Sequence, residues 1–202
     1  MRIAIDGPAG AGKSTVARAV AGALGYTYLD SGAMYRSAAL AQPKDPASLH
    51  IAFDGERVLL DGDDVTAAIR TPEISQAASR LATDPAVRGA MVAKQRALLR
   101  DGDWVAEGRD IGTVVAPDAP VKVYLTADPA ARAARRSAEQ SGADVAATQA
   151  DLLRRDGIDS GRAVSPLAMA DDAHHIDTTP YTLDEVVDQI VVLVQKAQTS
   201  ES

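Results

Sequence analysis

The chain of 202 residues contains no cysteine, and this absence excludes several kinds of chemistry. Disulfide bridges, thiolate catalysis and zinc sites built from cysteine all require that side chain. Aromatic residues make up only 3% of the chain, so the core must consist mainly of Ala, Val, Leu and Ile. No apolar run approaches the ~20 residues of a membrane span, and no apolar signal-peptide segment opens the sequence. We therefore expect a cytoplasmic protein with no membrane contact.

Positive charge is also in short supply. The 21 Lys and Arg residues are outnumbered by 28 Asp and Glu residues, so the formal net charge is −7. An acidic protein is a poor candidate for coating nucleic acid, so we expect small molecules rather than nucleic acid as partners. Any anionic ligand must then be held by local clusters of arginine.

Short apolar segments alternate with helical patterns at both ends of the chain. This alternation indicates an α/β fold with a parallel sheet and helices on both faces. The predicted strands are 2–5, 26–30, 104–110, 121–127 and 173–177. The predicted helices of this part are 13–25, 31–41, 129–140, 145–156 and 182–197, with a break at 141–144.

The middle of the chain has a different pattern. Two β-like runs joined by Asp54-Gly55 predict a hairpin. A Thr-Pro pair and an Asp-Pro pair resemble helix N-caps followed by proline, and they predict helices that begin at Pro72 and Pro85. We interpret this part as an insertion into the main domain. The boundaries that we predict are 41–103 for the insertion, and 1–40 with 104–202 for the core.

The first predicted strand leads into the sequence GPAGAGKST, which satisfies G-x-x-x-x-G-K-[ST], the phosphate-binding loop. Its glycines let backbone N–H groups surround a phosphate, and the following helix N-terminus adds partial positive charge. Lys13 is expected to contact the β- and γ-phosphates of ATP, and Ser14 to ligate Mg²⁺. The expected ATP-binding residues are Gly7, Pro8, Ala9, Gly10, Ala11, Gly12, Lys13, Ser14 and Thr15.

Polar residues after two other predicted strands indicate where a second substrate binds. In a parallel α/β sheet, the carboxyl ends of the strands line the ligand crevice. Ser31 and Arg36 follow the strand 26–30. The segment EGRDIGT follows the strand that begins with WVA, and there Arg109 is able to hold a phosphate and Asp110 to accept from an amino group.

Two further arginine clusters stand out in this acidic chain. Arg132, Arg135 and Arg136 have the spacing of one helix face, and so do Arg155, Asp159 and Arg162. Gly157 and Gly161 weaken the prediction of a helix around the second cluster. Phosphoryl transfer depends on cations that stabilise the charge of the transferred group, and guanidinium groups suit that role.

The segments IDGPAGAGKST, YLDSGAMYR, EGRDIGTVVAPDAPVKVYLTA and RRDGIDSGRAVSPL together resemble the bacterial cytidylate kinases. The resemblance covers nearly the whole chain, and the later segments are much more specific than the phosphate loop. It implies a P-loop NTPase fold of three αβα layers around a five-stranded parallel sheet. The inserted lobe then binds the nucleoside monophosphate and contains a small antiparallel sheet, and a short lid lies at about 137–155.

The resemblance also implies an activity, the transfer of a phosphoryl group from MgATP to CMP or dCMP by a typically monomeric enzyme. The residues that it places on the acceptor are Ser31, Arg36, Ser79, Arg88, Arg109, Asp110, Arg155, Asp159 and Arg162. Among them Ser79, Arg88 and Asp110 would read the cytosine, and Asp159 the ribose. The residues expected in catalysis are Lys13, Arg109, Arg132, Arg155 and Arg162, with Arg132 at the lid hinge and the ATP side.

Two features of the sequence depart from this family. The stretch AQPKDPAS is shorter than its usual counterpart, and RRDGIDSGR has fewer arginines. One alternative is another P-loop kinase, acting on UMP, AMP or a phosphorylated vitamin precursor, which Ser79, Arg88 and Asp110 argue against. A second alternative is a nucleotide-binding regulator with a protein partner, which has little need for the arginine set. The absence of an NKxD motif argues against a GTPase.

Overall fold

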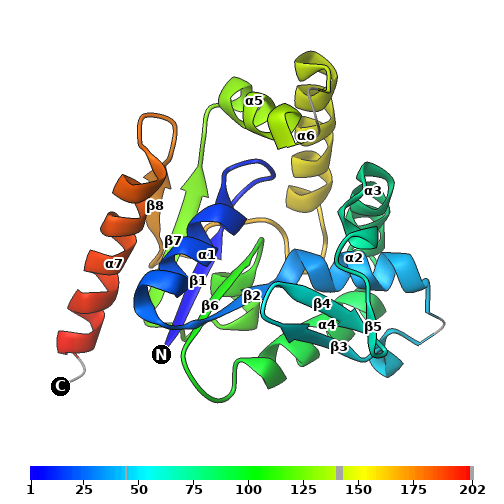
Figure 1. Ribbon diagram of the computed structural model, residues 1–202, viewed down its shortest axis with the longest axis horizontal. Helices are drawn as coiled ribbons and strands as arrows, with labels where there is room; N and C mark the ends of the chain where they lie inside the picture. Colours follow the sequence, from blue (N-terminus) through cyan, green and yellow to red (C-terminus); the bar gives the residue numbers. More distant parts are fainter. Residues whose placement is uncertain (44, 140–142, 201–202) are drawn as a thin grey trace.

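The computed structural model describes residues 1–43, 45–139 and 143–200, and a parallel sheet forms its centre (Figure 1). The strands of this sheet are β1 (Arg2–Asp6), β2 (Thr27–Asp30), β6 (Trp104–Gly108), β7 (Val121–Thr126) and β8 (His174–Asp177). They lie in the order β2-β6-β1-β7-β8, and every neighbouring pair runs parallel. The predicted five-stranded parallel sheet is confirmed.

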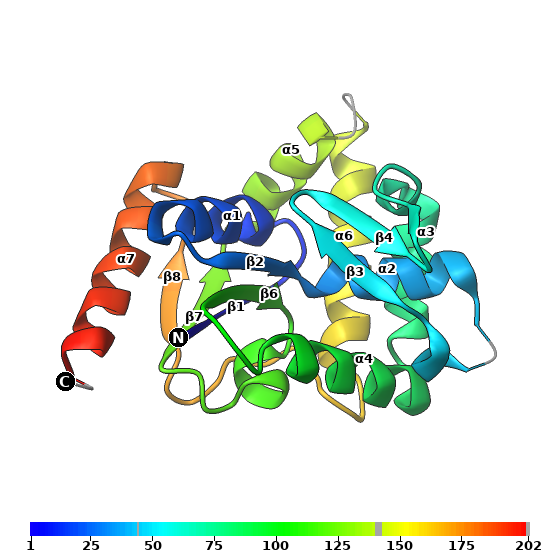
Figure 2. The ribbon, with the colours of Figure 1, turned by 60° about the horizontal axis from the view of Figure 1, so that its bottom comes forward.

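Helices cover both faces of the sheet. The helices of the described residues are α1 (Lys13–Leu24), α2 (Ser31–Ala41), α3 (Pro72–Leu81), α4 (Pro85–Leu98), α5 (Pro129–Glu139), α6 (Val145–Ser160) and α7 (Leu183–Ser200). Of these, α1 and α7 lie over one face and α2 and α4 over the other. In Figure 2, α1 lies above the strands and α4 lies below them. This arrangement confirms the predicted three-layer α/β fold.

The two faces of the sheet contribute to two apolar clusters. Ile3 and Ile5 of β1 and Val105 of β6 belong to the cluster under α1 and α7. Ala4 and Ala106, at the alternate positions, belong to the cluster under α2 and α4. Because side chains alternate between the faces of a strand, each buried strand supplies both clusters.

Several helices begin and end where their local sequence predicts. Helix α1 ends at Gly25, whose φ of 69° is left-handed. Helix α3 begins at Pro72 with Thr71 as its side-chain cap, and α4 begins at Pro85 with Asp84 as its cap. The capping side chains accept backbone N–H groups that have no partner inside the helix, so these starts are fixed locally.

The part of the chain between α2 and β6 contains the predicted small sheet. Its antiparallel strands are β3 (Ile51–Asp54), β4 (Arg57–Leu60) and β5 (Asp63–Asp64), and short 3₁₀ turns lie at Pro46–Ser48 and Ala68–Arg70. Asp54 pairs with Arg57 across the predicted hairpin turn. Val58 and Ile69 pack against Ala33 of α2, so this small sheet is attached to the main domain through α2.

The end of α6 differs from the prediction. The helix was expected to end at residue 156 because of the glycines that follow, but it continues through Gly157 to Ser160. A glycine inside a helix costs about 1 kcal/mol relative to alanine. Buried ion pairs of Asp156 and Asp159 with arginines of other segments hold this last turn in place and offset that cost.

A π-helical turn over Ile111–Val115 was not predicted. It begins directly after Asp110, and it is held by Asp6 at the end of β1. The two carboxylate oxygens of Asp6 accept hydrogen bonds from the backbone N–H groups of Ile111 (2.9 Å) and Gly112 (2.7 Å). Burial raises the pKa of Asp6 to about 6. We call this segment the π turn.

The predicted lid at about 137–155 includes residues 140–142, which lie outside the described residues. The same is true of the end of the predicted helix 129–140 and of part of the predicted break at 141–144. In the part of the chain that the structure describes, no helix is both long enough and apolar enough to cross a membrane.

Candidate active site

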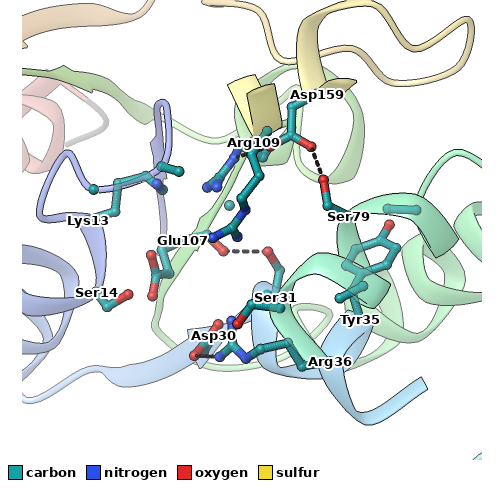
Figure 3. A pocket seen from close by; sticks show the side chains of 18 of the residues that line it. Lys13, Ser14, Asp30, Ser31, Tyr35, Arg36, Ser79, Glu107, Arg109 and Asp159 are labelled. Atoms are coloured by element: carbon teal, nitrogen blue, oxygen red, sulfur yellow. Dashed lines mark hydrogen bonds and ion pairs between the residues drawn. The ribbon is translucent and has the colours of Figure 1, made fainter. Parts of the chain in front are cut away.

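A pocket of about 200 Å³ lies at the carboxyl ends of β1, β2 and β6 (Figure 3). Its walls come from the phosphate loop, the start of α2, helix α3, the turn after β6 and helix α6. Figure 3 shows Lys13, Ser14 and Glu107 on one side and Ser79 and Tyr35 on the other. Residues far apart in the sequence therefore meet in one crevice, as the strand order requires.

The phosphate loop needs its glycines for geometric reasons. Gly10 (φ 77°) and Gly12 (φ 85°) have left-handed backbones, and a Cβ at Gly7 would lie 2.1 Å from the carbonyl oxygen of Leu125. The loop residues that line the pocket are Ala9, Gly10, Gly12, Lys13, Ser14 and Thr15. Gly7 instead packs on β7, and Ala11 lies in the core under α1.

Lys13 is buried at the first position of α1. Its Nζ atom donates a hydrogen bond to the carbonyl oxygen of Pro8 at 2.8 Å, so the side chain folds back over its own loop. Burial and the charge of Arg109 lower the pKa of Lys13 to about 7. A bound anion would compensate both effects, which suits a group that binds phosphate.

Glu107 is a site residue that the sequence analysis missed. It is the penultimate residue of β6, is buried, and lines the pocket beside the phosphate loop. Its carboxylate accepts hydrogen bonds from the hydroxyls of Tyr28 and Ser14, and burial raises its pKa. A single acidic residue in an apolar strand is the signal that could have indicated it, because burying a carboxylate is costly without a function or a partner.

Ser14 and Glu107 together offer hydroxyl and carboxylate oxygens beside the phosphate loop. Mg²⁺ prefers such oxygen ligands, and it usually binds one or two protein groups while phosphates and water complete its shell. No group of three or more His, Cys, Asp or Glu side chains able to hold a metal was found among the described residues. The small donor set fits a metal that arrives with a nucleotide.

The opposite wall contains a buried ion pair. Nη1 of Arg88 donates to Oδ2 of Asp110 at 2.7 Å, and the two side chains are only 2% and 5% exposed. Nε of Arg88 donates to the carbonyl oxygen of Ala82, and the guanidinium lies 5.0 Å from the centre of the Tyr35 ring. Burial raises the pKa of Asp110. Ser79 lines the same pocket, so the predicted trio of Ser79, Arg88 and Asp110 lies around one cavity.

A second cluster surrounds Asp159 near the end of α6. Its carboxylate accepts from Nε of Arg109 at 2.9 Å and from the hydroxyl of Ser79 at 3.5 Å, and it pairs with Arg162 at 3.2 Å. Arg155 lines the pocket beside them, and its Nε has no hydrogen-bond partner among the described residues. Burial and the charge of Arg109 lower the pKa of Arg155 to about 10. This excess of buried positive charge is suited to an anionic ligand.

Ser31 begins α2 and Arg36 lies in the middle of this helix, and both line the pocket, as the sequence predicts for the crevice. The hydroxyl of Ser31 donates to the carbonyl oxygen of Glu107 at 2.6 Å, and Arg36 pairs with Asp30 at 2.9 Å. A Cβ at Gly32 would lie 2.9 Å from Nη1 of Arg36. Glycine at this position therefore makes room for the Arg36 side chain.

The three arginines of α5 point to different places. Arg136 lines the pocket. Arg135 donates to the hydroxyl and the carbonyl oxygen of Thr178, which lies just after β8. Arg132 is buried against the phosphate loop and does not appear among the described residues that line the pocket. The shared helix face that the spacing predicts therefore does not bring all three guanidinium groups to one ligand.

A phosphate loop, a five-stranded parallel sheet and a crevice lined by arginines define a P-loop kinase. Solved structures share this fold: a gluconokinase from Sinorhizobium meliloti has a TM-score of 0.54 and 17% identity, with coverage of 99% of this chain and 95% of that one. A shikimate kinase from Acinetobacter baumannii has a TM-score of 0.50 and 19% identity, with coverage of 96% and 93%. At this level of identity the likeness concerns the fold alone.

The chain belongs to the cytidylate kinase family, whose sequence model matches residues 3–196. A cytidylate kinase from Rhodococcus opacus is 46% identical, and the match covers 96% of this chain and 94% of the relative. One from Streptomyces griseus is 44% identical, with coverage of 96% and 92%. The resemblance found in the sequence is thereby confirmed, and the protein is an enzyme of the nucleoside monophosphate kinase class.

Proposed function

We propose that the protein transfers the γ-phosphoryl group of MgATP to CMP or dCMP, forming ADP and CDP or dCDP. The observation that supports this most strongly is the pairing of two phosphate-binding surfaces in one pocket. The phosphate loop forms one surface, and the arginines around Asp159 form the other. Transfer between two phosphates requires such a pair, because both substrates must be held at once.

On the donor side, the left-handed glycines leave a backbone surface free of side chains. Lys13 is buried beside this surface, where it would bind an anion. Gly10, Gly12 and the first turn of α1 would hold the phosphates of ATP with their N–H groups. Ser14, with Glu107 beside it, would hold Mg²⁺. When bound, the ion neutralises phosphate charge and orients the γ-phosphoryl group.

On the acceptor side, Arg36, Arg109, Arg155 and Arg162 would hold the phosphate of CMP, and Asp159 would hold the ribose. Asp110 would accept a hydrogen bond from the amino group of cytosine, and Arg88 and Ser79 would donate to its ring nitrogen and carbonyl oxygen. Uracil has a carbonyl oxygen where cytosine has the amino group. It would leave the buried carboxylate unpaired, which is a strong basis for rejection.

The chemistry then requires little from the protein beyond position and charge. An oxygen of the CMP phosphate forms the new bond to the γ-phosphorus, and the bond from this phosphorus to the bridging oxygen of ADP breaks, with its electron pair leaving on ADP. The attacking oxygen is already anionic, so no general base is needed. Lys13, Arg109, Arg155 and Arg162 would stabilise the charge on the transferred group.

We further propose the division of the chain that the sequence predicts. The core at 1–40 and 104–202 would bind ATP, the lobe at 41–103 would bind the acceptor, and the lid at about 137–155 would close over both. Closure of these parts would exclude water and limit the hydrolysis of ATP. We expect the enzyme to act as a monomer, because every residue proposed for the acceptor lines the same pocket of one chain.

The release of ADP from MgATP, measured with CMP, dCMP, UMP, AMP and GMP offered singly, tests this function. We expect CMP and dCMP to give the highest kcat/KM. An enzyme that uses AMP or UMP as well as CMP would overturn the assignment of the acceptor. An enzyme that uses none of the five would overturn the proposed reaction.

A further inference from the structure

The tip of the phosphate loop is held from outside by two side chains. The N–H group of Ala9 donates to Oδ1 of Asp156 at 2.9 Å, and the carbonyl oxygen of Ala9 accepts from Nη1 of Arg132 at 2.8 Å. Arg132 also donates to Oδ2 of Asp156 at 2.5 Å. Arg132 comes from α5 and Asp156 from α6, so a closed ring of three bonds ties both helices to one residue of the loop. We call this ring the Ala9 clamp.

Packing restricts the same part of the loop. A Cβ at Gly10 would lie 3.1 Å from Cβ of Arg132 and 3.3 Å from Cδ1 of Leu152. Ala9 itself forms a small apolar cluster with Ala133 and Leu152. In Figure 1 the loop between β1 and α1 reaches toward α5 and α6. The loop tip is therefore in close contact with these two helices and is not free to move independently of them.

The ring also compensates the positive charge of Arg132 with the carboxylate of Asp156. The side chains of Arg132 and Asp156 are 7% and 16% exposed, so the pair is mostly shielded from water and each charge is compensated by the other. Neighbouring arginines Arg136 and Arg155 line the pocket, whereas Nη1 of Arg132 is engaged by Ala9 and Asp156. In this structure Nη1 of Arg132 therefore faces the loop backbone and Asp156, and Arg132 does not line the pocket.

Helix α6 extends from the clamp to the acceptor side of the pocket. Arg155 precedes Asp156 and lines the pocket. Asp159 lies three residues after Asp156 and pairs with Arg109 and Arg162. One helix thus holds the phosphate loop through one carboxylate and the arginines proposed for the acceptor through another. Its position sets the relation between the two surfaces.

We propose that Arg132 and Asp156 are positioning residues, which hold the phosphate loop in the conformation that binds ATP and do not contact the phosphates themselves. This inference rests on the proposed function only in taking ATP as the ligand of the loop. It assigns Arg132 a role different from the catalytic one that the sequence predicts. It also assigns a role to Asp156, which the sequence analysis left without one.

A double-mutant cycle tests the clamp with Arg132→Gln, Asp156→Asn and the combined variant. Each single change breaks the ring, so we expect each to weaken the binding of the analogue Mg-AMP-PNP about tenfold, measured by calorimetry. The combined variant should bind no more weakly than either single variant, because one ring can be lost only once. The KM for CMP should stay within about twofold of wild type, since the clamp does not touch the acceptor.

Other results would overturn the proposal. If Arg132 contacts phosphate directly, Arg132→Gln should lower kcat far more than Asp156→Asn, and the two effects should multiply. Equal losses of CMP and AMP-PNP binding in both single variants would indicate general damage to the fold. Asp156→Asn leaves the charge of Arg132 unpaired, and this variant is therefore at risk of not folding. The combined variant leaves neither charge, so its AMP-PNP affinity then tests the proposal.

Asp172→Asn is the matched control. Asp172 pairs with the buried cation of Lys122, outside the residues that line the pocket, and both KM values should stay close to those of wild type. The binding measurement does not require turnover. If the enzyme fails to phosphorylate CMP but the clamp variants lose AMP-PNP affinity as expected, the proposed reaction fails while the clamp stands.

Discussion

Replacing Asp110 by Asn is expected to remove most of the preference for CMP over UMP. The substitution keeps the size of the side chain but removes the charge that pairs with Arg88 at 2.7 Å. A carboxylate only accepts hydrogen bonds, so it favours the amino group of cytosine. An amide both donates and accepts, so the variant is able to pair with either base.

The magnitude follows from the burial of the pair. Asp110 is 4% exposed, so solvent screens the proposed hydrogen bond very little. A hydrogen bond to a charged group contributes roughly 1.5–3 kcal/mol, which corresponds to about a ten- to hundredfold loss in the CMP-to-UMP ratio of kcat/KM. The KM for ATP should change by no more than about twofold, because the loop that binds ATP is not altered.

The variant should also be less stable, and by a separate mechanism. Removing one partner of a buried ion pair leaves the other charge uncompensated, at a cost of about 3 kcal/mol. For a protein of this size, that cost corresponds to a melting temperature lower by about 6–12 °C. Rates must therefore be measured well below the melting transition of the variant.

Initial rates of ADP release with CMP and with UMP, together with thermal unfolding, measure both effects. Asp118→Asn is the control, since it breaks an exposed pair with Arg2 far from the pocket and should change neither the ratio nor the melting temperature appreciably. A CMP-to-UMP ratio that stays the same in Asp110→Asn would refute the assignment of Asp110 as the reader of the amino group. So would a KM for ATP that rises as much as the KM for CMP.

Three other predictions concern the donor metal, the lysine and the acceptor phosphate. Burial lowers the pKa of Lys13 to about 7, and the phosphates of MgATP should raise it, so binding at about pH 7.5 should take up part of a proton. Calorimetry in two buffers with different ionisation enthalpies measures this uptake, which should disappear in Lys13→Met; its persistence there would implicate another group. Glu107→Gln should raise the Mg²⁺ concentration for half-maximal activity about tenfold and leave the KM for CMP unchanged, so a magnesium titration that matches wild type would contradict the proposed metal site. Gly32→Ala places a Cβ 2.9 Å from Nη1 of Arg36 and 3.1 Å from Oδ1 of Asp30. It should displace the Arg36 side chain and raise the KM for CMP about tenfold with little change in melting temperature, whereas an unaltered KM would show that Arg36 does not bind the acceptor.

The features that the sequence predicts correctly are those fixed by neighbouring residues. The left-handed Gly25 ends α1, and a capping residue followed by proline starts α3 and α4. The alternation of strands and helices likewise identifies the parallel sheet, because each buried strand is a short apolar run. The phosphate loop belongs to this group, since its glycines and its lysine all lie between Gly7 and Lys13.

The features that the sequence misses depend on partners that are distant in the chain. Helix α6 passes through Gly157 because ion pairs with remote arginines hold its last turn. The π turn forms on the carboxylate of Asp6, 105 residues before Ile111. Neither the remote arginines nor Asp6 can be recognised from the residues of α6 or of the π turn. The periodicity of these two segments alone therefore does not predict their structure.

The site residues divide in the same way. Ser31, Arg36, Arg109 and Asp110 were found from their places after predicted strands, and the structure puts all of them on the pocket wall. Ser79 and Arg88 lie inside helices without a local signal, and only the family resemblance pointed to them. Helical spacing grouped Arg132 with Arg136, but spacing alone does not show that Asp156 lies beside one of them. The roles of all these residues in binding and catalysis stay predictions.

The carboxylate of Asp6 has a consequence for the mechanics of the enzyme. It immediately precedes the phosphate loop in the chain, and its hydrogen bonds to Ile111 and Gly112 fix the residues that immediately follow Asp110. One buried carboxylate therefore joins the start of the phosphate loop to the turn that carries Asp110. Movement of the proposed lobe at 41–103 would carry Ser79 and Arg88 with it, whereas Asp110 stays joined to the start of the phosphate loop. The acceptor pocket would therefore combine one wall that is joined to the donor loop with another wall that moves.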